Sequence, residues 1–462
     1  MQRLLGLTLA TFAFSSLTGA PATARTGGAG GIDFDQRTQR AAIDVAALLT
    51  AARGAPPMIC SLASRSLRGW GWGGSDAPVS PLSTVATSLR DDEGFRSDAL
   101  PAEDIQRLFA GLASDDACVR ELSVRLIGTQ KAEIVGADLV TRLGSSDQTV
   151  RTVAALGLGL VEAQTAVDPL IRALRDPSTD VRANSAWALG RLENGRALAP
   201  LISLFSDNTE RVREAAVAAV GHMDSTTAIA ALIRVLRQDE APSVRRVAAW
   251  ALGHLEAREA VDALAGALAR DADSRVREMS AWALGSIEDR RSVSALSAAA
   301  RGDAEDRVRE TAVWALGSLE DRSAVEVLAA ATGDRSANVR GTAAWALGQM
   351  DENGAKAPAG LLRLLSDESS DVRLKAAWAL GQIEDPGALA PIKDALKAER
   401  NDRVRRALIR ALMKSGESSQ ETLTQLLSST DPQVREAAVR GIAGARSFDP
   451  WPWPWPRPRP FP

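Results

Sequence analysis

Apolar residues recur along most of the chain with the period of amphipathic helices, and short polar turns separate these helices into pairs. In one representative unit, residues 167–174 carry apolar side chains at positions i, i+3, i+4 and i+7, which form one stripe on a helix. The Asp-Pro-Ser segment 176–178 ends this helix and supplies capping oxygens, and a second helix is expected over 181–192. Asn194-Gly195 then marks a turn into the next unit. The pattern predicts an all-α chain of helix pairs.

The helix pair repeats at a nearly constant period. The dipeptide Val-Arg opens the second helix eleven times, at intervals of roughly 32 residues. The valines are Val119, Val150, Val181, Val212, Val244, Val276, Val308, Val339, Val372, Val404 and Val434. Because one helix pair cannot bury its apolar face alone, repeats of this length stack into a continuous array. We therefore expect an α-solenoid of about eleven helix pairs over residues 101–446.

Two segments carry a resemblance to a known family. Residues 180–190 read DVRANSAWALG and residues 243–253 read SVRRVAAWALG. They resemble the HEAT-like repeats of the phycobilisome-lyase type, and the resemblance covers about 101–446. It implies a right-handed α-solenoid whose second helices line the concave face. It says little about activity, because this repeat serves many functions.

Charged residues recur at two fixed places in the repeat. The arginine that follows each valine is expected to form an ion pair with an Asp or Glu of the neighbouring unit. An acidic residue lies twelve positions after the valine, at the end of the second helix, where it is expected to form the turn or to pair with the next repeat. These acids are Glu193, Asp224, Glu256, Glu288, Glu320, Asp351 and Glu384.

A row of tryptophans is the chief candidate for a binding site. Trp187, Trp250, Trp282, Trp314, Trp345 and Trp378 each lie six residues after the repeat valine. At about 100° per residue they are expected to point well away from the core and to form a stripe along the concave groove, broken at Ala218. The rings either contact a ligand or pack flat on the next helix, and both roles stay open. Charges expected beside the stripe are Glu214, Arg246, Glu278, Glu310 and Arg406.

The first 24 residues have the pattern of a secretory signal peptide. Arg3 precedes an uncharged, mostly apolar run from Leu4 to Leu17, and Ala22-Thr23-Ala24 fits a small-x-small cleavage site. This run is shorter than the roughly 20 residues that a membrane span needs. We expect an exported protein, periplasmic or secreted, that is cleaved after about Ala24.

Residues 25–100 are expected to form an N-terminal helical segment, with one helix over 38–53, and a Gly-rich loop. Trp70 and Trp72 in this loop are expected to plug the open end of the solenoid rather than to bind a ligand. The chain has two cysteines, Cys60 and Cys118. After export they would either form a disulfide or remain separate buried thiols, and the sequence leaves these alternatives open.

The last segment, residues 447–462, has proline at every second position over most of its length. Proline at this density excludes helix and sheet pairing, so we expect a polyproline II or disordered tail. Its candidate binding residues are Trp451, Trp453, Trp455, Arg457 and Arg459. Because aromatic grooves bind proline-rich segments, the tail could dock on the groove of its own or a neighbouring molecule.

Composition and motifs exclude several classes of function. The net charge of −3 gives no general attraction to nucleic acid. His222 and His254, the two histidines, are expected about 10 Å apart and therefore unable to share a zinc ion. The sequence has no His-Glu dipeptide, no HExxH, no GxSxG and no P-loop. We predict no catalytic residue, no metal and no cofactor.

The sequence therefore favours a binding protein over an enzyme. The leading interpretation is an extracytoplasmic scaffold that holds a protein or extended peptide on its concave, Trp-lined face. The alternative is a membrane- or cell-wall-associated protein that acts through its Trp/Pro/Arg-rich tail, the only part expected to contact a membrane. A repeat-type enzyme of the hydroxylase or lyase kind is a distant third.

Overall fold

The structure, a computed structural model, describes the residues 43–56, 60, 100–350, 356–416, 424, 426–429, 432, 435–436 and 438–439. The chain divides into two compact units, Met1–Asp44 and Val45–Pro462, and the features below belong to the second. The predicted signal peptide, the loop tryptophans Trp70 and Trp72, the acidic residue Asp351 and the whole tail lie outside the described residues.

The described residues fold into helices, with no strand among them. Helix α1 (Val45–Ala52) is followed by ten helix pairs. Their first helices are α3 (Ala102–Gly111), α5 (Ala132–Leu143), α7 (Val167–Ala173), α9 (Leu198–Ser203), α11 (Ile229–Gln238), α13 (Val261–Arg270), α15 (Val293–Gly302), α17 (Val325–Ala331), α19 (Ala359–Arg363) and α21 (Leu389–Ala398). Their second helices are α4 (Ala117–Ile127), α6 (Gln148–Leu160), α8 (Thr179–Leu192), α10 (Glu210–His222), α12 (Pro242–His254), α14 (Ser274–Ile287), α16 (Asp306–Ser318), α18 (Ala337–Gln349), α20 (Ser370–Ile383) and α22 (Asp402–Lys414).

Short 3-10 turns adjoin many of the first helices. Most of them lead into the helix, and two, η3 and η8, follow α9 and α19. They are η1 (Gln164–Ala166), η2 (Gly195–Ala197), η3 (Leu204–Ser206), η4 (Thr226–Ala228), η5 (Arg258–Ala260), η6 (Arg290–Ser292), η7 (Arg322–Ala324), η8 (Leu364–Ser366) and η9 (Pro386–Ala388).

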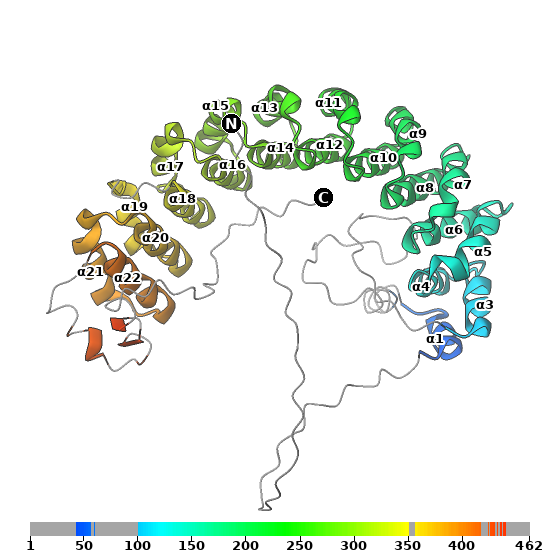
Figure 1. Ribbon diagram of the computed structural model, residues 1–462, viewed down its shortest axis with the longest axis horizontal. Coiled ribbons are helices and arrows are strands. Elements are labelled where there is room, and N and C mark those ends of the chain that lie inside the picture. The colour runs from blue at the N-terminus through cyan, green and yellow to red at the C-terminus, as the bar shows by residue number, and fades with distance from the viewer. Residues whose placement is uncertain are drawn as a thin grey trace, which may run out of the picture. The chain divides into compact units, whose positions relative to one another are not determined.

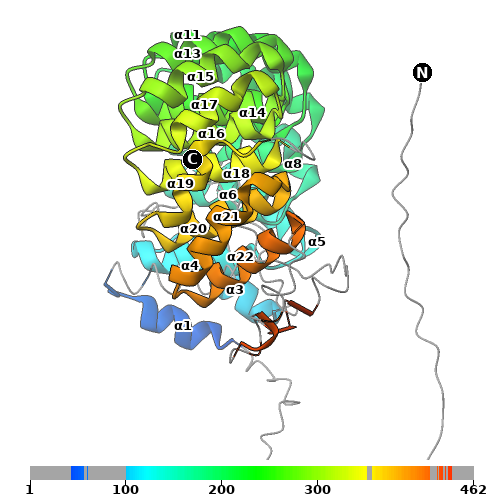
Figure 2. The same ribbon diagram turned by 90° about the vertical axis from the view of Figure 1, so that its left-hand side faces the viewer.

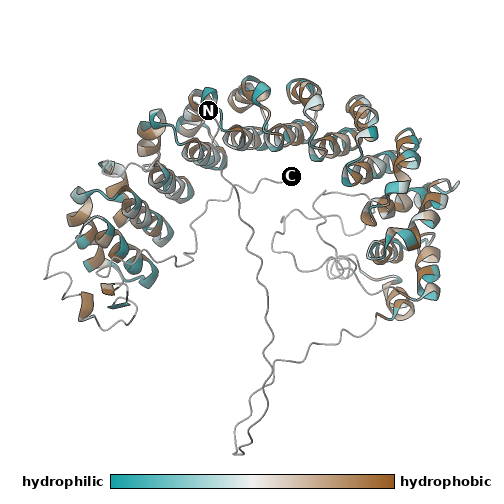
Figure 3. Cartoon of the chain, in the orientation of Figure 1, coloured by the Kyte–Doolittle hydropathy of each residue, from teal (hydrophilic) through white to brown (hydrophobic). Residues whose placement is uncertain are grey.

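The helix pairs stack side by side in two layers, which confirms the predicted all-α solenoid. Each second helix packs against its own first helix, and those from α6 to α20 also pack against the second helices of both neighbouring repeats. The second helices form the inner layer and the first helices the outer layer (Figure 1), and the view in Figure 2 shows the same order of repeats. Each helix carries a hydrophobic and a hydrophilic side (Figure 3). The apolar sides meet between the layers, where Val181, Leu189 and Leu252 are fully buried.

The eleventh helix pair lies largely outside the described residues. The residues that are described there include helical positions, and buried Leu426 and Ala438 pack against Ile409 of α22. The apolar core therefore continues beyond the tenth pair, as the repeat pattern predicts.

Helix α1 covers the N-terminal end of the stack. Cys60 is bonded to Cys118 of α4, with 5.6 Å between their Cα atoms, so of the two alternatives the structure has the disulfide. Both cysteines lie in one apolar cluster with Ala52 and Leu122. The N–H of Gly54 donates to Oδ2 of Asp116, the N-terminal cap of α4, at 2.8 Å. Helix α1 therefore covers this end of the stack, whereas Trp70 and Trp72, which the sequence expects to plug it, lie outside the described residues.

None of the helices among the described residues combines the length and the apolarity that crossing a bilayer requires.

Candidate protein-binding face

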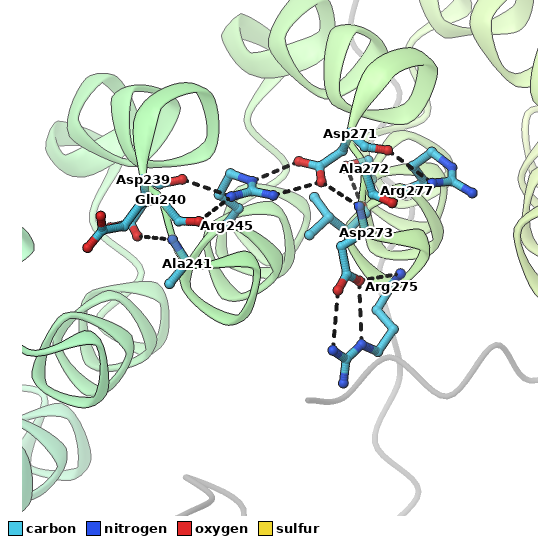
Figure 4. A network of polar contacts seen from close by, with 11 residues as sticks. Asp239, Glu240, Ala241, Arg245, Asp271, Ala272, Asp273, Arg275 and Arg277 are labelled. Atoms are coloured by element: carbon cyan, nitrogen blue, oxygen red, sulfur yellow. Dashed lines mark hydrogen bonds and ion pairs between the residues drawn. The ribbon is translucent and has the colours of Figure 1, made fainter.

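The arginine after a repeat valine joins its own repeat to the next one in eight of the repeats. The Nε and Nη2 atoms of Arg245 each donate to a carboxylate oxygen of Asp271, at 2.8 Å (Figure 4). Nη1 of the same guanidinium donates to the carbonyl oxygens of Asp239 and Glu240, at 2.9 and 3.0 Å. The N–H of Asp273 donates to the Asp271 carboxylate as well, at 3.0 Å. One guanidinium thus connects the loops of two consecutive repeats.

We call each such arginine–carboxylate pair a rung. The rungs are Arg151–Asp176, Arg182–Asp207, Arg213–Asp239, Arg245–Asp271, Arg277–Asp303, Arg309–Asp334, Arg340–Asp367 and Arg373–Glu399. The predicted inter-repeat ion pair is therefore confirmed. Its acidic partner lies five residues before the next repeat valine, and serine replaces that acid at Ser145 and Ser429. For this reason Arg120 and Arg405 have no carboxylate at the equivalent place, and the rungs stop short of both ends.

Six of the rung carboxylates have pKa values below their usual range and are held in their ionised form. Burial alone would raise the pKa of Asp271, but the fork from Arg245 and the N–H of Asp273 lower that pKa below its usual range. The pKa values of Asp207, Asp303, Asp334, Asp367 and Glu399 are lowered against the same burial effect.

We expect the rungs to make the fold sensitive to acid. A carboxyl whose pKa is lower in the folded than in the unfolded chain stabilises the fold above its unfolded value, about 3.9 for Asp. That stability is lost as the pH falls through the lower folded value. Unfolding on acidification should therefore begin below about pH 4, as measured by circular dichroism during a pH titration. In Asp271→Asn, which is less stable at neutral pH, the titration should be shallower; a curve parallel to that of the unchanged chain would contradict this assignment.

The acidic row at the ends of the second helices forms the turns. Glu288 ends α14 in the left-handed conformation, with φ of 52°. The same conformation occurs at Glu162, Glu193, Asp224, Glu256, Glu320 and Glu384. Two of these acids also meet a cation of the following repeat, in the pairs Glu162–Arg191 and Glu384–Lys414, and Oδ1 of Asp224 lies 3.6 Å from Nε2 of His254. Both predicted roles, turn formation and inter-repeat pairing, therefore occur.

The two histidines lie closer together than the sequence predicted. The ring centroids of His222 and His254 are 5.9 Å apart, well short of the full repeat spacing that was expected between them. Trp250 accounts for this, because His254 stacks on its indole at 5.3 Å and His222 tilts against it at 4.9 Å. Both side chains thus converge on one ring. Among the described residues, no group of three or more His, Cys, Asp or Glu side chains is arranged to hold a metal ion.

Each tryptophan of the row lies over a glycine of the preceding repeat. A methyl group placed on Gly253 would come within 2.8 Å of Cζ3 of Trp282 and of Cα of Ala283. The corresponding pairs are Trp187 on Gly159, Trp250 on Gly221, Trp282 on Gly253, Trp314 on Gly285, Trp345 on Gly317 and Trp378 on Gly348. The indole can lie against the neighbouring helix because glycine has no side chain there. The packing is on the preceding helix, not on the next one.

This packing corrects one expectation about the row. Trp187, Trp250 and Trp345 are buried, so these three rings do not add exposed surface to a continuous stripe. The other three rings, Trp282, Trp314 and Trp378, are half-buried and keep part of their surface exposed. At the break in the row, the three atoms nearest to a methyl group placed on Gly190 all belong to Ala219.

The predicted charges lie on the same side of the second helices as the ring row. We call this surface, made of the residues two and six positions after each repeat valine, the inner face. Glu214, Arg246, Glu278, Glu310 and Arg406 are all half-buried there. Nη2 of Arg246 lies 4.0 Å from Oε1 of Glu214.

Burial changes the acidity of these groups. It raises the pKa of Glu214, Glu278 and Glu310, and the nearby cations Arg246, Arg307 and Lys375 offset the shift only in part. It also lowers the pKa of Arg246. The ionised carboxylates are therefore poorly solvated, and an added cationic group would stabilise them. Half-exposed Trp282 and Trp314 lie on the same helices as Glu278 and Glu310 and supply aromatic surface beside them.

Helix pairs stacked in this way define the class of α-solenoid repeat proteins. The sequence matches the HEAT repeats family at 136–221, 167–241, 229–317, 293–359 and 356–413. Together these matches span more than half of the chain, and the protein belongs to this family. No curated protein sequence matches the chain.

Solved structures are similar to the chain at low sequence identity. The chain is similar to Kap95p from a complex with RanGDP, at 15% identity and a TM-score of 0.53, covering 86% of this chain and 63% of that one. It also matches an engineered protein at 22% identity and a TM-score of 0.40, covering 74% of this chain and 99% of that one. A third match is the CpcE–CpcF phycocyanin lyase of Nostoc sp. PCC7120, at 25% identity and a TM-score of 0.32, covering 53% and 92%.

Proposed function

We propose that this protein is an interaction scaffold whose inner face binds an extended peptide or protein segment that carries basic residues. The observation that supports this most directly is the combination of half-buried Glu278 and Glu310 with half-exposed Trp282 and Trp314 on two adjacent second helices. Carboxylates with raised pKa values gain from a cationic partner. The indole faces add contact area and attract cations.

The fold is consistent with this proposal. Stacked helix pairs expose one long continuous face, which suits an extended segment better than a small molecule. Kap95p, which shares the fold at low identity, was solved in a complex with RanGDP. We further propose that the protein acts outside the cytoplasm. The signal-like N-terminus and the Cys60–Cys118 bond support this location, because such bonds persist in oxidising compartments.

Selection from a displayed peptide library would test the binding face. The chain from residue 25 onward should enrich extended peptides with Arg or Lys next to apolar residues. The double variant Glu278→Gln, Glu310→Gln should bind these peptides about tenfold to a hundredfold more weakly, because it removes two charge-assisted contacts. Isothermal titration with the enriched peptides would measure the loss. The substitutions keep the size of both side chains, so the fold should be unaffected.

The matched control is Glu133→Gln with Glu326→Gln. Both glutamates are exposed on first helices, α5 and α17, away from the inner face. This variant should bind the peptides as the unchanged chain does. Equal binding by both double variants, or a library that yields no binder, would count against the inner face as the site.

A further inference from the structure

The outer layer of the array carries most of the basic charge of its central repeats. The segments 226–238, 258–270 and 290–302, which contain the first helices α11, α13 and α15, have seven basic and two acidic residues. The loops and second helices between them, residues 239–257 and 271–289, have four basic and eight acidic residues. Positive charge is therefore concentrated on the outer layer here, although the whole chain has a net charge of −3.

Four exposed arginines of this layer have no acidic partner. We call them the outer arginine row, and they are Arg234, Arg237, Arg270 and Arg301. No carboxylate of the described residues lies within ion-pair distance of any of them. By contrast, Arg291, on the 3-10 turn before α15, is paired with Asp289 at 2.8 Å. The row therefore holds cationic groups that are still able to pair with an added anion.

The row crosses three adjacent outer helices. Arg237, Arg270 and Arg301 lie in the last turns of α11, α13 and α15, and Arg234 lies one turn earlier in α11. Helix α13 contacts both of its outer neighbours, and helices in contact have axes about 8–10 Å apart. Because the negative end of a helix dipole attracts cations, the dipoles account for part of the preference for arginine in the last turns. They do not account for Arg234, which lies outside the last turn.

The surface around the row suits an acidic polypeptide better than a nucleic acid or a bilayer. Helices α11, α13 and α15 contain no aromatic residue on which a base could stack. The large apolar side chains that are exposed among the described residues lie elsewhere, so none on these helices would insert into a membrane. Each guanidinium has a planar fork that matches a carboxylate. Charge complementarity therefore favours a chain of side-chain carboxylates.

We propose that the outer arginine row binds an acidic segment of another polypeptide, which runs across α11, α13 and α15. At about 3.3 Å per extended residue, a segment of about six to eight residues spans these three helices. The protein then has two binding surfaces of opposite preference, one on each layer. The contact on the outer layer does not depend on whether the inner face binds the basic peptides described above.

A fluorescently labelled, glutamate-rich peptide of about twelve residues, long enough to cross the row, tests this contact. It would be titrated with the full chain and followed by fluorescence anisotropy. The triple variant Arg237→Gln, Arg270→Gln, Arg301→Gln should bind about tenfold or more weakly, because three charge-assisted contacts are lost. Binding to the unchanged chain should also weaken between about 50 and 150 mM salt, since exposed charges are screened. All three positions are exposed, so the circular dichroism spectrum should not change.

The matched control is the triple variant Arg211→Gln, Arg275→Gln, Arg307→Gln. It removes the same charge from exposed positions in the first turns of the second helices α10, α14 and α16. We expect it to bind the acidic peptide as the unchanged chain does. Equal weakening by the two triple variants would reduce the contact to a net-charge effect and overturn the proposal. No binding at about 50 mM salt, or tighter binding to phosphatidylglycerol vesicles than to the peptide, would overturn it as well.

The two binding surfaces can be tested separately in the same proteins. The variant of the outer arginine row should still bind the basic peptides selected on the inner face. The double variant Glu278→Gln, Glu310→Gln should still bind the acidic peptide. Failure of one proposal is therefore distinct from failure of the other.

Discussion

Arg277→Ala is expected to lower the free energy of unfolding by about 2–4 kcal/mol, because it leaves a largely buried carboxylate without its cation. In the unchanged chain Arg277 and Asp303 are only 15% and 9% exposed, and Nε to Oδ2 is 2.8 Å. The same guanidinium donates to the carbonyl of Asp271, so its removal also leaves loop carbonyls with fewer partners. Urea denaturation followed by circular dichroism would measure the effect. Hydrogen exchange would show whether α14 and α16 open first, as expected for an array held by neighbour contacts.

The control is Arg196→Ala, whose partner is Asp168. This pair also joins two repeats, but its side chains are 65% and 51% exposed. Exposed ion pairs contribute about 0–1 kcal/mol, so the loss here should be small. Arg277→Lys keeps the charge but cannot donate two parallel hydrogen bonds to Asp303. Its loss in the free energy of unfolding should lie between those of Arg277→Ala and Arg196→Ala. If Arg277→Ala and Arg196→Ala lower the free energy of unfolding by the same amount, the rungs do not hold the repeats together as described.

Gly253→Ala is expected to destabilise the fold by about 1–3 kcal/mol, although alanine is the better helix former. The added methyl would lie 2.8 Å from both the Cα of Ala283 and the Cζ3 of Trp282. Backbone cannot move aside as a flexible side chain can, so α12 and α14 must separate. The change in urea midpoint would give the magnitude, and the Trp fluorescence should shift because Trp282 rests on this glycine.

Gly302→Ala is the matched control for this substitution. Gly302 is the last residue of α15, and a methyl placed on it would meet nothing within 4 Å. Here the helix preference of alanine should be neutral or favourable by up to about 1 kcal/mol. A stabilising Gly253→Ala would mean that the second helices do not approach as closely as the structure indicates.

Much of the fold follows from the sequence because the repeat imposes it. A Val-Arg step that recurs at a nearly constant interval fixes the second helix, and the apolar period fixes which side faces the first helix. The sequence predicts the ion pairs as a type of contact but does not identify their acids. The signal was present, since an acid lies five residues before eight of the eleven valines. These acids lie in the loops between the two helices of a repeat and follow no helical period. Which arginine each of them faces is therefore seen only in the stacked repeats.

The packing of the tryptophan row could not be predicted from the geometry of one helix. The wheel angle directs Trp282 and its equivalents away from the first helix, but it treats each helix alone. Whether an indole extends outward or packs flat on the adjacent helix depends on the residue opposite it. Gly253 has no side chain, so Trp282 can pack flat there. The histidine spacing failed for a related reason. A repeat distance locates backbones, whereas His222 and His254 both lean onto Trp250.

In the part of the chain that the structure describes, the rungs lie along one edge of the array, and this makes its mechanics asymmetric. Forked pairs such as Arg277–Asp303 fix the distance between successive repeats where each first helix turns into its second. At the opposite edge, the contacts are more exposed and less regular, as in His254–Asp224 at 3.6 Å. Under strain, successive repeats should therefore separate at the opposite edge and rotate about the rung edge, which acts as the hinge. Such an array should change its curvature without unfolding any repeat.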